Sequence, residues 1–266
     1  MSTQKTPFPD LPAIGIEFPR SPVAAAAFAY TKEHTSEATY NHCVRSAYWA
    51  LILAKKLPGY ANPPSPLNLE TVVLANVLHD MGWATTKALR SKDKRFEVDG
   101  ANLALAFLRR YAEEGGEGGQ SWKNDAHRAR LVWDAIALHT TGSIAVHHPA
   151  PEVALAHLGV MADFQGPLFP PGGGAVIAEA EYREVVRHFP LAGFGREGVK
   201  EIMCGLCREK PETTYDNFVS AFGLAFGVDG KGGGREEFAA AMKRGEPLWK
   251  ILEGLGYLEE LLGKEA

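Results

Sequence analysis

The stretch "LANVLHDMGWATT", residues 74–86, joins an apolar helical run to two adjacent ionisable side chains. The apolar positions are spaced three and four apart and end at Leu78, and His79 and Asp80 follow directly. Neighbouring residues on a helix point about 100° apart, so this pair can serve one site only if that site lies off the helix end. A metal ion is one occupant that suits both groups. Two separately solvated side chains at a helix end are the alternative.

The composition of the chain limits its fold class and its partners. The chain has 266 residues, of which 45% are hydrophobic, and can therefore bury a large core. A net charge of -4, a pI near 6.2 and scattered Lys and Arg residues argue against a nucleic-acid partner. We expect a small-molecule substrate. The oligomeric state stays open, with a homo-oligomer among the alternatives.

Targeting and redox features favour a cytoplasmic protein without a membrane partner. The apolar run "VAAAAFA", residues 23–29, is too short to span a membrane, and no signal peptide is evident. Three cysteines in a chain of this length do not make a disulfide framework, which fits a reducing compartment.

Helical patterns follow one another along most of the chain, and no alternating strand pattern separates them. The clearest cover residues 37–57, capped by Ser36 or Thr39, and residues 68–80, capped by Asn68. Further helices are expected within residues 98–114, 123–140, 151–166, 175–189, 196–209, 214–226 and 236–262. The sequence therefore predicts an all-α fold.

The expected domain organisation is simple. Residues 1–21 are rich in proline and lack periodicity, so they form an extended N-terminal arm. Glycine-rich breaks at 115–119, 172–174 and 230–234 are not accompanied by a shift in composition. We therefore expect residues 22–266 to form a single helical domain that ends in a C-terminal helical extension.

Side chains that can bind a metal occur on three of the expected helices. His42 lies on a different face from the apolar stripe of its helix, and His79 and Asp80 end the next one. Asp163, in "VMADFQG", interrupts an apolar helix, where a lone carboxylate is costly to bury unless it is paired or coordinated. These groups form either a metal site or a set of satisfied polar groups in a core.

The order His42, His79-Asp80, Asp163 is an H…HD…D signature, and with it the chain resembles the HD-domain superfamily of helical metal-dependent hydrolases. Most of residues 36–220 are similar to the cyanamide hydratase group of HD proteins. The segments that carry this likeness are "TYNHCVRSAYWALILAKKL", "LHDMGWA", "RFEVDGA", "IALHTTG" and "IMCGLCREKP". The resemblance implies an HD-domain helical bundle whose four signature residues hold one Zn²⁺ that hydrates cyanamide to urea. Mn²⁺ or Fe²⁺ also suits these donors.

A single metal ion is expected rather than two. HD proteins with two irons carry an additional histidine just before a Gly-Ala step, which here is Gly100-Ala101. Phe96 and Glu97 occupy the positions where that histidine would stand. A second metal therefore lacks a ligand.

The implied chemistry is attack of a zinc-bound hydroxide on the nitrile carbon, since Zn²⁺ lowers the pKa of a bound water from 15.7 to roughly 7. Three residues are then expected to be catalytic. They are Asp80, His139, which would donate a proton to the nitrile nitrogen, and Glu97, whose carboxylate would orient a ligand histidine. Both residues also have a non-catalytic alternative. His139 can be a histidine that the helix dipole favours at the C-terminal end of its helix, and Glu97 can be a solvated surface residue.

Four further residues are candidates for contacting the substrate. Thr140 would hydrogen-bond the amino group of cyanamide, Trp83 and Phe164 would line a narrow pocket, and Lys87 follows the HD pair closely enough to reach an anion. The plainer alternatives are core aromatics and an exposed lysine.

Two other functions remain open from the sequence. A phosphohydrolase acting on a nucleotide or other phosphomonoester needs convergent basic side chains, and the nearest to the signature are Arg45, Lys87 and those within residues 90–95. The other is a metal-binding or ligand-sensing protein without catalysis.

The pair Cys204 and Cys207 matches C-x-x-C with no preceding strand and no second pair, so its role also stays open.

Overall fold

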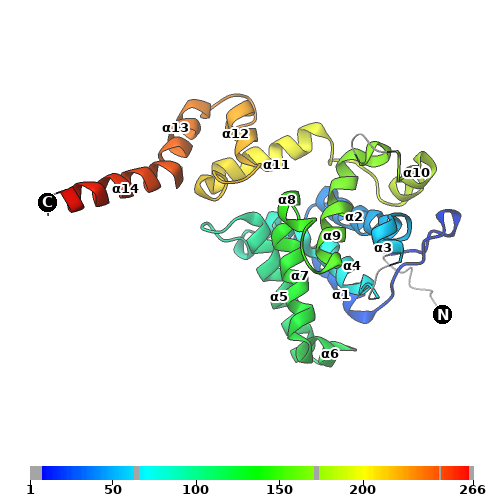
Figure 1. Cartoon of the computed structure of the whole chain (residues 1–266). Helices are drawn as coiled ribbons and strands as arrows, with labels where there is room; N and C mark the ends of the chain where they lie inside the picture. The colour runs from blue at the N-terminus through cyan, green and yellow to red at the C-terminus, as the bar shows by residue number, and fades with distance from the viewer. Residues whose placement is uncertain (1–7, 63–65, 171–173, 246, 264–266) are drawn as a thin grey trace. The chain divides into compact units, whose positions relative to one another are not determined.

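The computed structural model describes residues 8–62, 66–170, 174–245 and 247–263. Over these residues the chain is all-α, with α-helices and short 3-10 helices, and the only strand-like pairing is an isolated bridge between Leu11 and Ile16 (Figure 1). The predicted fold class is confirmed. None of the described helices is long and apolar enough to cross a membrane.

The first of two compact units comprises residues 1–91 and 96–194. Its α-helices are α1 (Pro22–His34), α2 (Glu37–Lys56), α3 (Pro58–Ala61), α4 (Leu69–Leu78), α5 (Phe96–Glu113), α6 (Gly119–Asn124), α7 (Ala126–Leu138), α8 (Gly142–Ala145), α9 (Pro151–Gln165) and α10 (Glu179–His188). Its 3-10 helices are η1 (Pro12–Ile14), η2 (His79–Trp83), η3 (Lys87–Leu89) and η4 (Gly166–Leu168).

Side-chain caps begin α2 and α4 at the residues that the sequence indicated. The hydroxyl of Ser36 accepts a hydrogen bond from the backbone N–H of Thr39, and the side chain of Asn68 accepts one from Thr71. Each bond satisfies a backbone donor that has no partner within its own helix. The caps therefore set where α2 and α4 begin.

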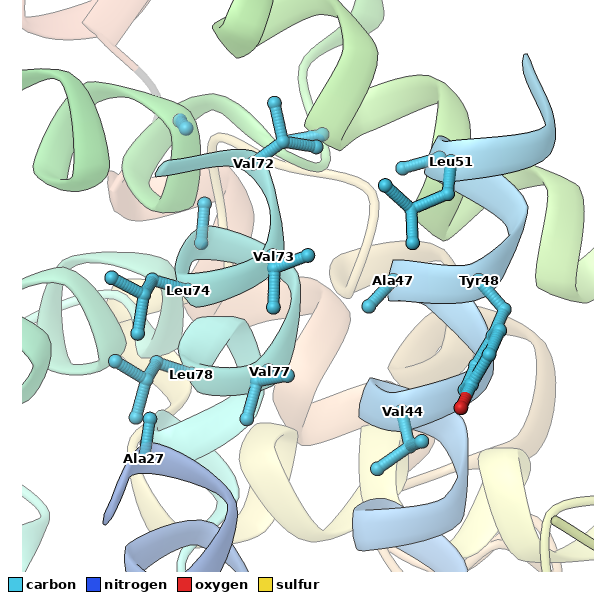
Figure 2. Close-up of a cluster of buried hydrophobic side chains, with 14 of the residues drawn as sticks. Ala27, Val44, Ala47, Tyr48, Leu51, Val72, Val73, Leu74, Val77 and Leu78 are labelled. Carbon is cyan, nitrogen blue, oxygen red and sulfur yellow. The ribbon is translucent and has the colours of Figure 1, made fainter. Parts of the chain in front are cut away.

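Helix α2 is the central helix of this unit and is buried on nearly every face. Figure 2 shows Val44, Ala47 and Leu51 of α2 facing Val73 and Val77 of α4. Because α9 covers the other side of α2, the stripe of α2 that carries His42 is buried as well. Polar side chains of α2 are thus held in the core and must be paired there.

A glycine allows α9 to approach α2 closely. A Cβ atom at Gly159 would lie 2.6 Å from the carbonyl oxygen of Ser46 and 2.8 Å from the Cβ of Ala50. Only a residue without a side chain fits that distance. This contact brings Asp163, one turn further along α9, next to the buried stripe of α2.

The second unit comprises residues 92–95 and 195–266. Its helices are α11 (Arg196–Glu209), η5 (Pro211–Thr213), α12 (Ser220–Phe226), α13 (Arg235–Gly245) and α14 (Pro247–Gly263). Its buried apolar residues are Met203, Cys204, Leu206, Cys207, Val219 and Phe238. None of these six belongs to the core cluster of the first unit. The sequence predicted one helical domain over residues 22–266, and this domain organisation stays a prediction.

The described part of the N-terminal arm is anchored to the first unit. Phe8, Leu11, Ile16 and Phe18 are buried in its core cluster, and η1 forms a turn between them. Residues 1–7, the first part of the predicted arm, lie outside the described residues.

Candidate metal centre

A change of helix type aims His79 and Asp80 at one point. Helix α4 ends at Leu78, and η2 begins with His79, followed by Asp80 with φ -97° and ψ 20°. This backbone departs from an α-helix, so the two side chains are not held at the usual angle about the helix axis. Close packing against α5 fixes the turn, because a Cβ atom at Gly100 would lie 2.5 Å from the carbonyl oxygen of His79.

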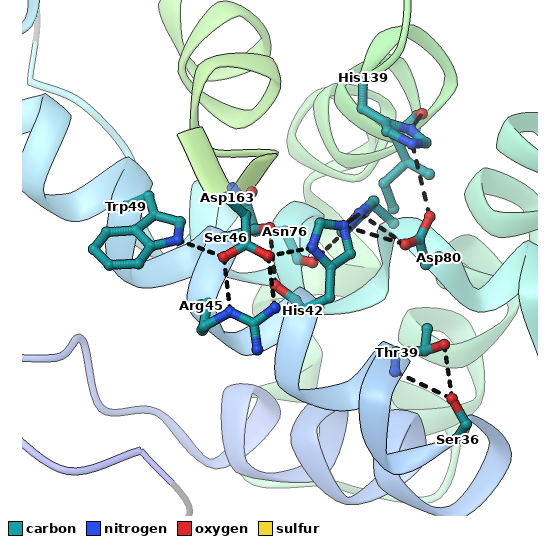
Figure 3. A network of polar contacts seen from close by, with 12 residues as sticks. Ser36, Thr39, His42, Arg45, Ser46, Trp49, Asn76, Asp80, His139 and Asp163 are labelled. Carbon is teal, nitrogen blue, oxygen red and sulfur yellow. Dashed lines mark hydrogen bonds and ion pairs between the residues drawn. The ribbon is translucent and has the colours of Figure 1, made fainter. Parts of the chain in front are cut away.

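Three potential metal-binding side chains meet at this turn. The Nε2 atoms of His42 and His79 are 3.2 Å apart, and Oδ2 of Asp80 lies 3.1 Å from Nε2 of His79 and 3.4 Å from Nε2 of His42. All three side chains are buried, and their ligand atoms lie within 4.8 Å of one another. Figure 3 shows His42 and Asp80 facing each other beside the Asp163 network.

Hydrogen bonds at Nδ1 leave the Nε2 atoms available to a metal. Nδ1 of His79 lies 2.6 Å from the carbonyl oxygen of Asn76, and Nδ1 of His42 lies 2.7 Å from Oδ2 of Asp163. Both partners are acceptors, so each Nδ1 carries the hydrogen and each Nε2 can offer its lone pair. Among the described residues, neither oxygen of Asp80 has a hydrogen-bonded donor. A buried carboxylate without donors is costly, and a cation between it and the two imidazoles removes that cost. The donor set therefore fits a divalent metal ion.

The pKa values of the cluster agree with a site built for positive charge. Burial raises the pKa of Asp80, but the neighbouring His79, followed by His42 and His139, lowers it below its ordinary value. Burial lowers the pKa of His79, yet Asp80 and then Cys43 raise it well above its ordinary value. The negative charge of Asp80 therefore favours a positive charge beside the two histidines, which a divalent metal ion would supply.

Asp163 lies beside His42 on the side away from Nε2. Its Oδ2 accepts hydrogen bonds from Nδ1 of His42 and Nη2 of Arg45, both 2.7 Å long. Its Oδ1 accepts from Nε of Arg45 and Nε1 of Trp49, also 2.7 Å each. Burial raises the pKa of Asp163, but the bonds to His42 and Arg45 bring it below its usual range, so the carboxylate is ionised. In this geometry Asp163 orients His42, and its predicted role as a metal ligand stays a prediction.

His139 reaches the cluster from the end of α7. Its Nδ1 lies 2.6 Å from the carbonyl oxygen of Ile136, and its Nε2 lies 3.8 Å from Oδ1 of Asp80. Burial, followed by the nearby His79, lowers the pKa of His139 to about 4. The ring is therefore neutral near pH 7, with its free lone pair at Nε2 turned toward Asp80.

Of the other candidates, Thr140 and Glu97 lie beside the site, whereas Lys87 is exposed. The hydroxyl of Thr140 donates to Oε1 of the buried Glu97 over 2.6 Å, next to His139 in the chain. Glu97 is thus linked to Thr140, and its predicted role in orienting a ligand histidine stays a prediction. Lys87 is exposed in η3.

Aromatic rings surround His42 and His139. Phe194 stacks on His42 at 4.1 Å between centroids, and Phe164 and Trp83 lie 5.2 and 6.4 Å from the same ring. Phe96 packs edge-on against His139 at 5.6 Å. The sequence suggested Trp83 and Phe164 as lining residues. It missed Phe194, which lies far along the chain with no motif around it, and Phe96, which was considered only as the place of an absent histidine.

Residues 39–160 match the family model of the HD domain. The match covers less than half of the chain and supports a likeness of this segment to the HD-domain superfamily, whose members are metal-dependent hydrolases. The matched segment contains His42, His79, Asp80 and His139 and ends before Asp163. No curated protein matches the chain.

Proposed function

We propose, from the premise that residues 39–160 form an HD domain, that this chain adds water to a small neutral nitrile, with cyanamide as the substrate. The proposal rests on the buried cluster of His42, His79 and Asp80. Each of these side chains turns toward the others an atom that can donate a lone pair to a cation. His42, His79 and Asp80 would hold a divalent ion, which would lower the pKa of a bound water toward neutral pH.

The surroundings of the cluster favour a small uncharged substrate. Trp83, Phe96, Phe164 and Phe194 present aromatic surface on several sides of the histidines. Trp83, Phe96 and Phe194 are buried and Phe164 is 45% exposed, and aromatic rings offer no partner to a strongly charged group. Cyanamide, which is linear and neutral, suits such a surface. The likeness of the sequence to the cyanamide hydratase group supports the same substrate.

His139 is placed to move the proton that hydration requires. Its Nδ1–H is held by the carbonyl oxygen of Ile136, so Nε2 accepts a proton from the attacking water. The water oxygen bonds to the nitrile carbon, and Nε2 of His139 returns the proton to the nitrile nitrogen. The product is isourea, which tautomerises to urea. This path differs from the sequence-based expectation of a donor only, since a neutral His139 must first accept.

Thr140 can position the substrate through its oxygen. Because its hydrogen is donated to Glu97, the hydroxyl oxygen keeps its lone pairs for the amino group of cyanamide. Glu97 then fixes the direction of the hydroxyl. In this role Glu97 positions a substrate-binding residue.

A phosphohydrolase acting on a phosphomonoester is the second candidate, because the HD-domain match favours hydrolases in general. A phosphate site needs basic donors aimed at the metal. Arg45 is buried beside the cluster, but its Nε and Nη2 donate to Asp163 and its Nη1 donates to the carbonyl oxygens of Phe189 and Pro190. Lys87 is exposed. These observations favour the nitrile over the phosphate.

The test is an assay of the purified, metal-loaded protein with cyanamide and with a panel of phosphomonoesters, measuring urea and inorganic phosphate. We expect urea and no phosphate. Asp80→Asn should abolish urea release, whereas His147→Ala, which changes an exposed histidine outside the cluster, should leave it unchanged. Phosphate release without urea would replace the first candidate with the second.

A further inference from the structure

The candidate metal centre is closed to solvent. His42 and Asp80 have no exposed surface, and His79 and His139 are 1% and 2% exposed. A hydrated ion or a substrate therefore reaches these groups only when a neighbouring side chain moves aside. The structure indicates which neighbour is free to do so.

Phe164 is the aromatic neighbour of the centre that reaches the surface. It is 45% exposed, and the centroid of its ring lies 5.2 Å from that of His42. The other aromatic neighbours already described are buried: Trp83, Phe96 and Phe194. Because nearly half of Phe164 is already in water, turning it outward exposes less apolar surface than moving any of these three rings.

The backbone on both sides of Phe164 is held in place. Asp163, the preceding residue, accepts four buried hydrogen bonds (Figure 3). Gly166, two residues after Phe164, packs so closely that an added Cβ would lie 2.9 Å from the ring of Tyr182. Rotation of an exposed side chain needs no change in the backbone and is fast. The ring of Phe164 can therefore move while the end of α9 stays where it is.

We propose that Phe164 is the entry residue of the metal centre, and that its ring turns outward to admit a metal ion or a substrate. The part of this inference that concerns the substrate rests on the proposed function, whereas the part that concerns the metal does not. Phe194 stacks on His42 at 4.1 Å, lies 5.7 Å from Phe164 and is buried, so it forms the fixed side of the opening. The room left when Phe164 turns away limits the size of the nitrile, and Phe164 therefore also determines specificity.

The first test measures the rates at which zinc enters and leaves the full-length protein. Entry is followed by stopped-flow after Zn²⁺ is mixed with chelator-treated protein, and exit by transfer of bound zinc to an excess of a coloured chelator. Phe164→Ala should raise both rates at least about tenfold and leave the dissociation constant unchanged, because a lower barrier accelerates both directions equally. Phe164→Trp, which enlarges the ring, should lower both rates.

The matched control is Phe226→Ala, which removes a ring that is 42% exposed in the second unit. This variant should leave both zinc rates unchanged. If Phe164 only packs against His42, its loss loosens that ligand, which speeds zinc exit and weakens binding without speeding entry. The comparison of entry with exit thus separates an entry residue from a packing residue.

The second test compares cyanamide with phenylcyanamide, which adds an aromatic ring to the same nitrile. Phe164→Ala should raise kcat/KM for phenylcyanamide relative to cyanamide at least about tenfold, measured as release of phenylurea and urea. If no variant hydrates either compound, the proposed function is wrong, while faster zinc entry and exit in Phe164→Ala would still support the entry role.

Two results would overturn the proposal. One is zinc entry into Phe164→Ala at the wild-type rate, whether or not exit changes. The other is an unchanged preference between the two nitriles in a Phe164→Ala protein that releases urea, which would show that substrates reach the metal centre by another route.

Discussion

Replacing Arg45 by methionine tests how the candidate centre is held in the core. The guanidinium of Arg45 is fully buried and donates two hydrogen bonds to Asp163 and two to the carbonyl oxygens of Phe189 and Pro190. Arg45→Met keeps an unbranched apolar stem that ends near the position of Nε, but it removes the guanidinium and leaves Asp163 buried without its counter-ion. Removing one partner of a buried ion pair costs about 3–5 kcal/mol. Each of the two carbonyls that loses its donor adds about 1 kcal/mol.

We expect Arg45→Met to lower the free energy of unfolding by about 4 kcal/mol, because Trp49 and His42 still donate to Asp163 and offset part of the loss. The assay is urea denaturation with a chelator present for every variant, so that loss of metal does not contribute. The double variant Arg45→Met/Asp163→Asn carries no uncompensated charge at this pair and should cost at least about 2 kcal/mol less than the sum of the single changes. Additive costs, or a loss below 1 kcal/mol for Arg45→Met, would refute the reasoning.

Three further changes have defined outcomes. His139→Ala should keep one bound metal, measured by elemental analysis, and lose about 10²- to 10⁴-fold in turnover of cyanamide. Full turnover by this variant would show that His139 has no catalytic role. Tyr40→Phe should flatten the loss of stability between pH 10 and 12. Burial raises the pKa of Tyr40 to about 12, so the unfolded chain loses this proton first and unfolding becomes easier as the pH rises; a slope equal to that of the wild type in chemical denaturation would contradict this. Gly159→Ala should cost about 1–3 kcal/mol of stability, because the new Cβ clashes with Ser46, whereas Gly59→Ala, where the added Cβ meets nothing within 4 Å, should not; equal effects in thermal denaturation would show that α2 and α9 can move apart.

Local patterns predicted the helices better than the way they assemble. Ser36 and Asn68 cap the helices that periodicity indicated, because capping depends on residues only three apart. The helix from Pro22 to His34 was not predicted, since its alanine-rich run has no polar face. The break at Asp125, whose side chain caps α7, was also missed. The separate core of residues 195–266 depends on contacts between helices that no local pattern encodes.

The candidate site shows the same limit. His42, His79 and Asp80 were predicted as a group because two of them are adjacent and all three occupy special positions in helical patterns. The pairing of Arg45 with Asp163 spans 118 residues and was not predicted, although each was considered separately. The signature suggested Asp163 as a ligand, and only the three-dimensional arrangement shows its oxygens bonded to Arg45, Trp49 and His42.

We propose that one divalent ion held by His42, His79 and Asp80 enables this chain to hydrate cyanamide to urea. The most direct measurement is a titration of Zn²⁺ into chelator-treated protein, with urea release from cyanamide recorded at each addition. The account predicts a rate that rises in proportion to bound zinc, reaches its limit at one equivalent per chain and is absent in Asp80→Asn. Bound zinc without urea at any loading would contradict the proposed reaction. A rate that continues to rise to two equivalents would contradict the single-metal centre.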